Sequence, residues 1–319
     1  MAFKENKGNG MKKVFLYGCG IILLSVLGFG WFIVTPETLP DSESHLHKKL
    51  RNLHMSLLYR YSNDPVMENK VHKSNIPLDI VIPIIEKDIP TAQYTIQSIK
   101  GLLMHPINKI YIVAPESNKL RNFASDNGLV FINENDVLPK FSGSKTQKGW
   151  IKQQYLKLNA DSFVEKDNFL VIDADMILMR AHVFIYKGKT IFNVYRDYSL
   201  ERKKFVQRIT GIDKFYNLDF TAHHMLFNKE KLKDFKTHLE TKYKKSWFDA
   251  LNDLDLEDGN FSEYELYANY MLKKYPNKFR FVHGRILNIE RNKLEGLNFI
   301  QGAYSNEFKA VSSHHFYNL

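Results

Sequence analysis

Cysteine is almost absent from this sequence of 319 residues. Its single copy, Cys19, lies inside an apolar N-terminal stretch, so no disulfide bond can form within the chain. Folding without disulfides is typical of proteins in reducing compartments. The soluble part of the chain is therefore expected to face such a compartment.

Two glycine-rich phosphate-binding signatures are missing as well. No Gly-x-Gly-x-x-Gly follows the first predicted strand, and no Walker-type Gly-Lys-Ser/Thr occurs. A phosphate ligand would therefore have to be held by a metal ion, because no glycine loop offers its backbone N–H groups.

Nucleic-acid signatures are also missing, although the chain is basic. The formal net charge is +10, which suggests an anionic partner such as nucleotide phosphate, a polyanionic acceptor or a membrane surface. The sequence has no Arg/Gly-rich tract, no Cys/His finger spacing and no paired-aromatic signature of a nucleic-acid module. We therefore expect no nucleic acid partner.

The first long apolar run predicts a membrane anchor. After an N-terminal tail of residues 1–13, residues 14–34 carry no charge, and at about 1.5 Å per residue such a helix spans the roughly 30 Å hydrocarbon core. A cleavable signal peptide is the alternative, but the run is too long and Val34-Thr35-Pro36 lacks a small-x-small cleavage site. Lysines lie on both sides of the run, so the orientation stays open.

Residues 35–77 are typical of a stem. Pro36 and Pro40 end the anchor, and leucines then recur at helical spacing among basic residues, at Leu46, Leu50, Leu53 and Leu57. Such a helix either lies on anionic lipid headgroups or packs on the domain that follows.

Strand and helix patterns alternate in residues 78–319. Short apolar runs predict a buried strand at Ile80–Ile82 and two further strands at Ile110–Val113 and Val130–Ile132. Thr91 is the predicted cap of a first helix, and a second helix from Ser117 to Asn127 is stopped by Gly128. This alternation predicts an α/β domain with a mostly parallel sheet and helices on both faces.

A polar segment and a further helix come next. Residues 133–149 have no apolar period and predict a mobile loop beside a site. In the helix from Gly149 to Leu158, the apolar residues are expected to face inward. Lys152, Gln153 and Lys157 are expected on its solvent face, with Lys152 and Gln153 as candidates for binding a cofactor.

The apolar run Phe169-Leu170-Val171-Ile172 predicts a strand buried on both faces, and it ends in two carboxylates, Asp173 and Asp175. Ligands of open α/β sheets bind at the carboxyl ends of strands, so both carboxylates are expected at the rim of a crevice. Oxygen ligands one residue apart suit Mg²⁺ or Mn²⁺, which in turn would hold the phosphates of a nucleotide. The alternative is an ordinary Asx turn after a strand.

Several motifs, taken in one order, resemble a known family. They are Ile-Val-Ile-Pro at 80–83, Gly-Trp at 149–150 followed by Gln-Gln-Tyr-Leu-Lys-Leu, Val-Ile-Asp-Ala-Asp at 171–175, Thr-Ala-His-His-Met-Leu-Phe at 221–227, Phe-Ser-Glu-Tyr-Glu-Leu-Tyr at 261–267 and Val-Ser-Ser-His-His at 311–315. Together they resemble the GT-A glycosyltransferase fold and a family of bacterial and viral glycosyltransferase-like proteins of largely unknown function. The resemblance implies Mn²⁺ or Mg²⁺, a nucleotide-sugar donor and a glycan or lipid-linked acceptor.

The resemblance also implies roles for the metal-binding candidates. Asp175 is implied as the direct metal ligand, and Asp173 as a contact to the ribose or a bridging group. A late histidine, His314 or His315, would complete the metal shell. The alternative is a terminal histidine pair without such a role.

Glu263 and Glu265 are candidates for the catalytic base that takes the proton of the acceptor hydroxyl. They lie at the start of a predicted helix that Ser262 caps, where acids also interact favourably with the helix dipole. Because they are two residues apart they point to different faces, so one is expected to enter the crevice, and Glu263 is favoured.

Substrate contacts are expected from His223, His224 and Trp150. The two histidines are adjacent in a predicted strand, so one is expected to meet the substrate while the other packs. Trp150 is expected either to stack on a sugar ring or to fill the core.

These observations predict a membrane-anchored, metal-dependent glycosyltransferase. The alternatives are a catalytically silent membrane-tethered glycan-binding or scaffold protein and another metal-dependent nucleotide-processing enzyme. A cytoplasmic domain on a bacterial inner membrane fits the missing disulfides. A Golgi-type luminal domain is the alternative, although it would expose the glycosylation sequon Asn260-Phe261-Ser262 inside the proposed catalytic segment.

Overall fold

The computed structural model describes residues 72–138, 148–195, 199–214, 218–254 and 261–313. The predicted anchor at 14–34, nearly all of the predicted stem, and His314 and His315 lie outside these residues. Within the described ranges, no helix combines the length and the apolar character that a membrane span needs.

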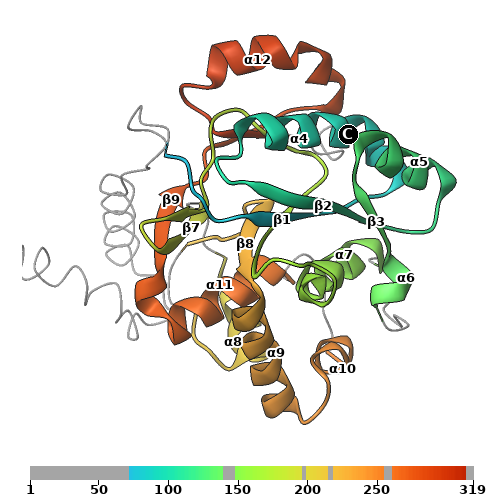
Figure 1. Ribbon diagram of the computed structural model, residues 1–319. Helices are drawn as coiled ribbons and strands as arrows, with labels where there is room; N and C mark the ends of the chain where they lie inside the picture. Colours follow the sequence, from blue (N-terminus) through green and yellow to red (C-terminus); the bar gives the residue numbers. More distant parts are fainter. Residues whose placement is uncertain (1–71, 139–147, 196–198, 215–217, 255–260, 314–319) are drawn as a thin grey trace, which may run out of the picture. The chain divides into compact units, whose positions relative to one another are not determined.

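A five-stranded sheet forms the centre of the described domain, in the order β3-β2-β1-β4-β8 (Figure 1). The strands are β3 Val130–Asn133, β2 Ile107–Ala114, β1 Leu78–Pro83, β4 Asn168–Ile172 and β8 His224–Asn228. The first four run parallel, and β8 is antiparallel to β4. The predicted α/β class with a mostly parallel sheet is confirmed, and a strand is present at each of these predicted positions, although β3 is only partly buried.

Alternation along the strands gives each face of the sheet its own core. On one face, α4 (Ile89–Leu102) and α5 (Asn118–Asn127) cover a cluster of buried aliphatic side chains that includes Ile80, Ile82, Leu170 and Ile172. On the other face, the rings of Phe169 and Phe227 stack with their centroids 5.7 Å apart. The ring of Phe227 also packs on that of Tyr267 in α11 (Glu263–Lys274), with a centroid distance of 4.4 Å.

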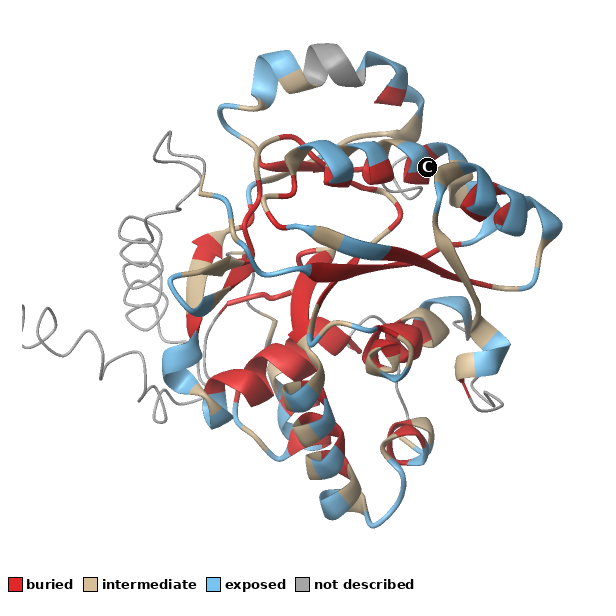
Figure 2. Cartoon of the chain, in the orientation of Figure 1, coloured by how far each residue is buried: buried red, intermediate tan, exposed pale blue. Residues whose placement is uncertain are grey.

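Helix α11 is deeply buried, since every residue from Glu263 to Leu272 is buried (Figure 2). It lies on the same side of the sheet as α7 (Lys148–Leu158) and α9 (Lys229–Tyr243) (Figure 1). The acidic start of α11 therefore lies inside the protein, where unpaired charge is costly.

Two small sheets and several short helices complete the described part. One sheet joins β10 (Ile286–Asn288), β11 (Ala310–Ser312) and β5 (Met176–Leu178), and the other joins β6 (Ile185–Tyr186), β7 (Lys189–Val194) and β9 (Phe279–His283). The remaining elements are η1 Glu86–Asp88, α6 Glu134–Val137, η2 Ala160–Ser162, α8 Leu200–Thr210, α10 Trp247–Asn252, η3 Pro276–Lys278, η4 Arg291–Gly296 and α12 Leu297–Tyr304.

The observed end of α5 agrees with the prediction from the sequence, whereas the start of α4 does not. The hydroxyl of Ser117 caps α5 by accepting from Leu120 N, and Gly128 ends it with φ +66°, as predicted. The predicted cap Thr91 is wrong, because α4 begins earlier, with Asp88 as the N-cap residue. Thr91 instead donates its hydroxyl to the Asp88 carbonyl at 3.0 Å. Of the predicted loop at 133–149, residues 139–147 lie outside the described residues, and Glu134–Val137 form one helical turn, α6.

Candidate active site

The Asp-x-Asp turn begins where β4 ends and leads into β5. Its backbone is held from two sides. Asp173 N donates to His223 O at 2.9 Å, and the Thr95 hydroxyl of α4 donates to Ala174 O at 2.9 Å. The carboxyl ends of the parallel strands β1, β2 and β3 lie at the same edge of the sheet as the end of β4. This is the edge where open α/β sheets bind ligands.

Both carboxylate oxygens of Asp173 have partners within the protein. Lys157 Nζ lies 2.6 Å from its Oδ1, and His223 Nδ1 lies 3.1 Å from its Oδ2. Burial raises the pKa of Asp173, but the ammonium of Lys157 and the contact with His223 outweigh burial, so the net pKa is well below the usual range. Asp173 therefore stays ionised beside a fixed cation.

The same lysine reaches Glu263 at the start of α11. Lys157 Nζ lies 3.0 Å from Glu263 Oε1, and only 2% of the lysine and 1% of the glutamate side chain is exposed. Burial raises the pKa of Glu263, Lys157 partly offsets this, and the charge of Asp173 raises it further. The lysine also lies over the Tyr264 ring, 4.7 Å from its centroid. One buried ammonium thus joins two acidic candidates that are far apart in the sequence.

The solvent-face prediction for Lys157 is wrong. Lys157 is itself buried, as are all residues from Gln154 to Leu158, so the second half of α7 has no solvent-exposed face. Helix α11 packs against α7 and encloses it. The available signal was a single charge within a short, otherwise apolar helix end, which is unusual unless the charge is paired.

Glu265 belongs to a second ionic cluster. Its Oε2 lies 2.7 Å from Lys214 Nζ and accepts from Asn269 Nδ2 at 3.0 Å, while its Oε1 accepts from Phe220 N at 2.8 Å. Its side chain is 0% exposed. These contacts fix the segment that leads to His223, and none of the contacts described for Glu265 reaches Asp173.

The structure separates the two adjacent histidines. His223 has a left-handed backbone with φ +56° and turns its ring to Asp173, with 27% of its side chain exposed. His224 is the first residue of β8 and is buried, with Nε2 2.9 Å from Asn193 Nδ2. Burial lowers the pKa of His224 well below its usual value. His223 is therefore the histidine that joins the Asp-x-Asp turn.

The other candidates on α7 lie near its beginning. Trp150 is 38% exposed, and its ring meets Phe261 edge to face with centroids 6.4 Å apart. Lys152 pairs with Glu134, which follows the carboxyl end of β3, so this lysine lies at the binding edge of the sheet. Gln153 is partly exposed.

The donor atoms beside Asp175 fit a hard divalent cation. Asp175 is partly exposed, and its carbonyl accepts from Ser313 N at 3.0 Å. Ser313 is fully buried, and its hydroxyl has no hydrogen-bond partner among the described residues. Carboxylate and hydroxyl oxygens suit Mg²⁺ and Mn²⁺. No group of three His, Cys, Asp or Glu residues that could hold a metal occurs in the described ranges, which stop one residue before His314.

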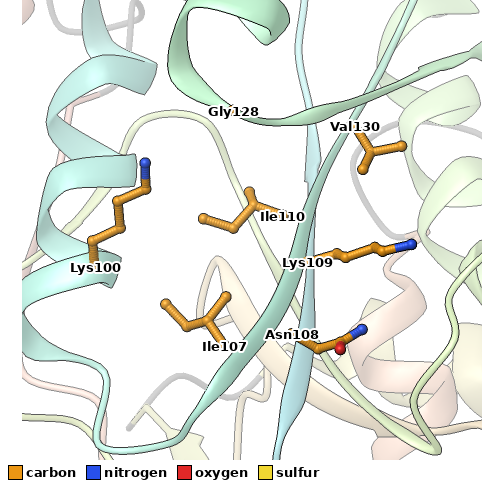
Figure 3. Close-up of a pocket in the computed structure, with 7 residues that line it drawn as sticks. All are labelled: Lys100, Ile107, Asn108, Lys109, Ile110, Gly128 and Val130. Atoms are coloured by element: carbon orange, nitrogen blue, oxygen red, sulfur yellow. The ribbon is translucent and has the colours of Figure 1, made fainter.

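A shallow hollow elsewhere on the domain does not include these residues. It lies at the amino ends of β2 and β3 and is lined by Lys100, Ile107, Asn108, Lys109, Ile110, Gly128 and Val130 (Figure 3). Because β2 and β4 run in the same direction, the amino end of β2 and the carboxyl end of β4 lie at opposite edges of the sheet. The hollow is therefore separate from the Asp-x-Asp turn.

Comparisons with known proteins give one family and a set of matching solved structures. The family described as "Family of unknown function (DUF6492)" matches residues 77–318. No curated protein gives a significant match.

Three of the solved structures that match the chain are glycosyltransferases of low sequence identity. Mouse xyloside xylosyltransferase 1 shares 11% identity over 75% of this chain and 98% of its own, with a TM-score of 0.43. The galactosyltransferase LgtC shares 12% over 74% of this chain and 87% of its own, with a TM-score of 0.40. The glycosyltransferase GlyE of Streptococcus pneumoniae shares 12% over 75% of this chain and 55% of its own, with a TM-score of 0.40.

Proposed function

The chain belongs to DUF6492, a family of unknown function, and we propose that its domain is a metal-dependent glycosyltransferase that uses a nucleotide-sugar donor. The observation that carries this proposal is the Asp-x-Asp turn at the carboxyl end of β4, with Asp173 joined to Glu263 through the buried Lys157. The acceptor would be a glycan or a lipid-linked glycan, as the sequence motifs imply.

Asp175 would hold Mn²⁺ or Mg²⁺ together with the diphosphate of the donor. When bound, such a cation neutralises the charge that develops on the departing phosphate. His314 and His315 directly follow Ser313, whose N–H is bonded to Asp175 O, and we retain one of them as a further ligand. Asp173, already paired with Lys157, would contact the ribose or a bridging group.

Glu263 is our preferred catalytic base. Its raised pKa brings it closer to the range in which a carboxylate accepts a proton from an acceptor hydroxyl efficiently. Lys157 would fix the position of the carboxylate and balance its charge. Glu265 is less well suited, because its oxygens already hold Lys214, Asn269 and Phe220 N.

His223 and Trp150 would orient the substrates. His223 is partly exposed beside Asp173, and Trp150 offers an exposed ring at the start of α7. Aromatic rings of this kind stack on the apolar faces of sugars. Lys152 and Gln153 would contact the donor from the same helix.

We further propose that residues 14–34 anchor the protein in a membrane. A bacterial inner membrane with a cytoplasmic domain is our preferred arrangement, because nucleotide sugars are supplied there and the chain, with one cysteine, forms no intrachain disulfide. A luminal, Golgi-type arrangement is the alternative.

The test is a panel of nucleotide sugars incubated with the full-length chain and either Mn²⁺ or a chelator. We expect release of one nucleoside diphosphate that requires the metal. Asp175→Asn should lower this rate by about a hundredfold or more, because the charge that holds the cation is lost. The matched control is Asp167→Asn, which changes an exposed residue at the opposite end of β4 and should leave the rate unchanged.

Two results would count against the proposal. If no donor is turned over but one raises the melting temperature, the protein is a silent binding or scaffold protein. If pyrophosphate or phosphate is released instead, it is another nucleotide-processing enzyme.

A further inference from the structure

The C-terminal strand is fastened directly to the Asp-x-Asp turn. Strand β11 is antiparallel to β5, with Ser312 opposite Met176. The pairing continues by one residue, because Ser313 N donates to Asp175 O at 3.0 Å. The backbone of Ser313 is thus bonded to the backbone of Asp175, the residue whose carboxylate would hold the candidate cation.

Arg291 holds this junction from the side. Its Nε donates to Ser313 O at 3.3 Å, and its two terminal nitrogens reach the short helix η1, at Lys87 O (3.3 Å) and Asp88 Oδ1 (2.6 Å). The arginine and aspartate side chains are only 20% and 16% exposed. One guanidinium therefore connects three segments of the chain, which are η1, η4 and the end of β11.

This contact requires the shape of arginine, as well as its charge. A guanidinium presents several donors in a rigid planar fork, whereas a lysine ammonium is a compact group on a flexible stem. Lysine at this position could satisfy Asp88 or Ser313 O, but its geometry does not match all three acceptors together.

We infer that Arg291 is a positioning residue that sets cation affinity by fixing Ser313 beside Asp175. It does not itself touch the cation, whose ligands would be oxygens. The inference rests on the proposed function, since it assumes a cation at Asp175. Groups that orient metal ligands from behind typically change metal affinity by about 10–100-fold when removed.

Electrostatics alone predicts the opposite result. Arg291 is positively charged, so removing its charge should, by Coulomb's law, strengthen the binding of a nearby cation. Replacing it by lysine keeps the charge and should then change nothing. A positioning role instead predicts weaker binding in both variants. The two explanations therefore predict opposite signs for Arg291→Gln, and for Arg291→Lys they predict a loss of affinity (positioning) and no change (electrostatics).

The experiment is a titration of the full-length chain with Mn²⁺ alone, followed by the electron paramagnetic resonance signal of the free ion. We compare the wild type with Arg291→Gln and Arg291→Lys. The matched control is Lys293→Gln, which removes one positive charge from the same helix η4 at a side chain that is 62% exposed. Circular dichroism checks that each variant is folded.

We expect the dissociation constant for Mn²⁺ to rise about tenfold or more in both Arg291 variants, and to stay within about twofold of the wild type in Lys293→Gln. Equal or tighter binding by a folded Arg291→Lys would overturn the role of Arg291 while leaving the metal site in place. Should Arg291→Gln fail to fold, the charge-conserving lysine variant decides alone. A wild type that binds no Mn²⁺ would reject the metal site, and this inference with it.

Discussion

Lys157 is the residue on which the acidic side chains of the site depend. Lys157→Met would leave Asp173 and Glu263 buried without their cation. Breaking a buried pair by removing one partner typically costs about 3–5 kcal/mol, so we expect a loss of this size in the free energy of unfolding, measured with urea. Lys152→Met is the control in the same helix. Its partly exposed pair with Glu134 should contribute less than about 1 kcal/mol.

A second substitution separates charge from packing in this variant. Adding Glu263→Gln to Lys157→Met removes one of the two uncompensated carboxylates, so the double variant should regain part of the lost stability. If it is no more stable than Lys157→Met, the loss comes from packing of the lysine stem rather than from its charge.

Glu263 should give the protein a specific pH dependence. A carboxyl group whose pKa is raised on folding stabilises the protein fully below its unfolded pKa, and this contribution is lost as the pH rises through the folded pKa. From about pH 4.5 upward, the wild type should therefore lose unfolding free energy relative to Glu263→Gln. Chemical unfolding of both proteins at a series of pH values measures this difference. Parallel curves would show that Glu263 titrates normally.

The acidic candidates could be predicted from the sequence, but their lysine could not. Asp173 and Asp175 follow a short apolar run, and the end of such a strand is recognisable locally. Lys157 lies on a helix whose period indicates one inward face. Its burial depends on α11, a distant segment that covers the other face, and periodicity within α7 carries no information about it.

At the scale of elements, α4 holds the backbone of the Asp-x-Asp turn through a side-chain hydrogen bond. Thr95 donates to Ala174 O, between the two carboxylates. Thr95→Val keeps the shape but leaves a buried carbonyl without its donor, which costs about 1–3 kcal/mol. We expect this loss in the unfolding free energy, together with weaker Mn²⁺ binding because the turn is less fixed.

Thr91→Val is the control for this prediction. Thr91 lies one turn earlier in α4, and its hydroxyl donates to Asp88 O, at the start of its own helix, and to no other acceptor among the described residues. We expect Mn²⁺ affinity to stay close to that of the wild type. Equal effects of the two variants on affinity would mean that α4 supports the fold in general and not the turn in particular.

The elements themselves were predictable where the controlling forces are local. Short apolar runs identify β1 to β4, and Ser117 and Gly128 mark the two ends of α5. The start of α4 was misplaced because Pro90 favours a first helical turn ahead of Thr91. The pairing of β11 with β5 joins segments far apart in the chain. No local pattern specifies such a pairing, although this pairing brings Ser313 to the Asp-x-Asp turn.

At the scale of the whole molecule, two features predict association with membranes. The chain has a net charge of +10, which attracts anionic headgroups, and it has the uncharged segment 14–34, which we predict to span the bilayer. The two modes respond differently to salt. Charge attraction is screened within about 3 Å at 1 M ionic strength, whereas burial of an apolar helix is not weakened by salt.

We therefore expect the full-length chain to stay in the membrane pellet at about 1 M salt, and to be released by detergent. Deletion of residues 14–34 should move it to the supernatant even at low salt, unless the basic surface also contributes. In that case the deletion variant should bind vesicles containing anionic lipid and leave them as salt is added. Release of the intact chain by salt alone would contradict the anchor, because a helix that spans about 30 Å of hydrocarbon cannot be displaced by screening.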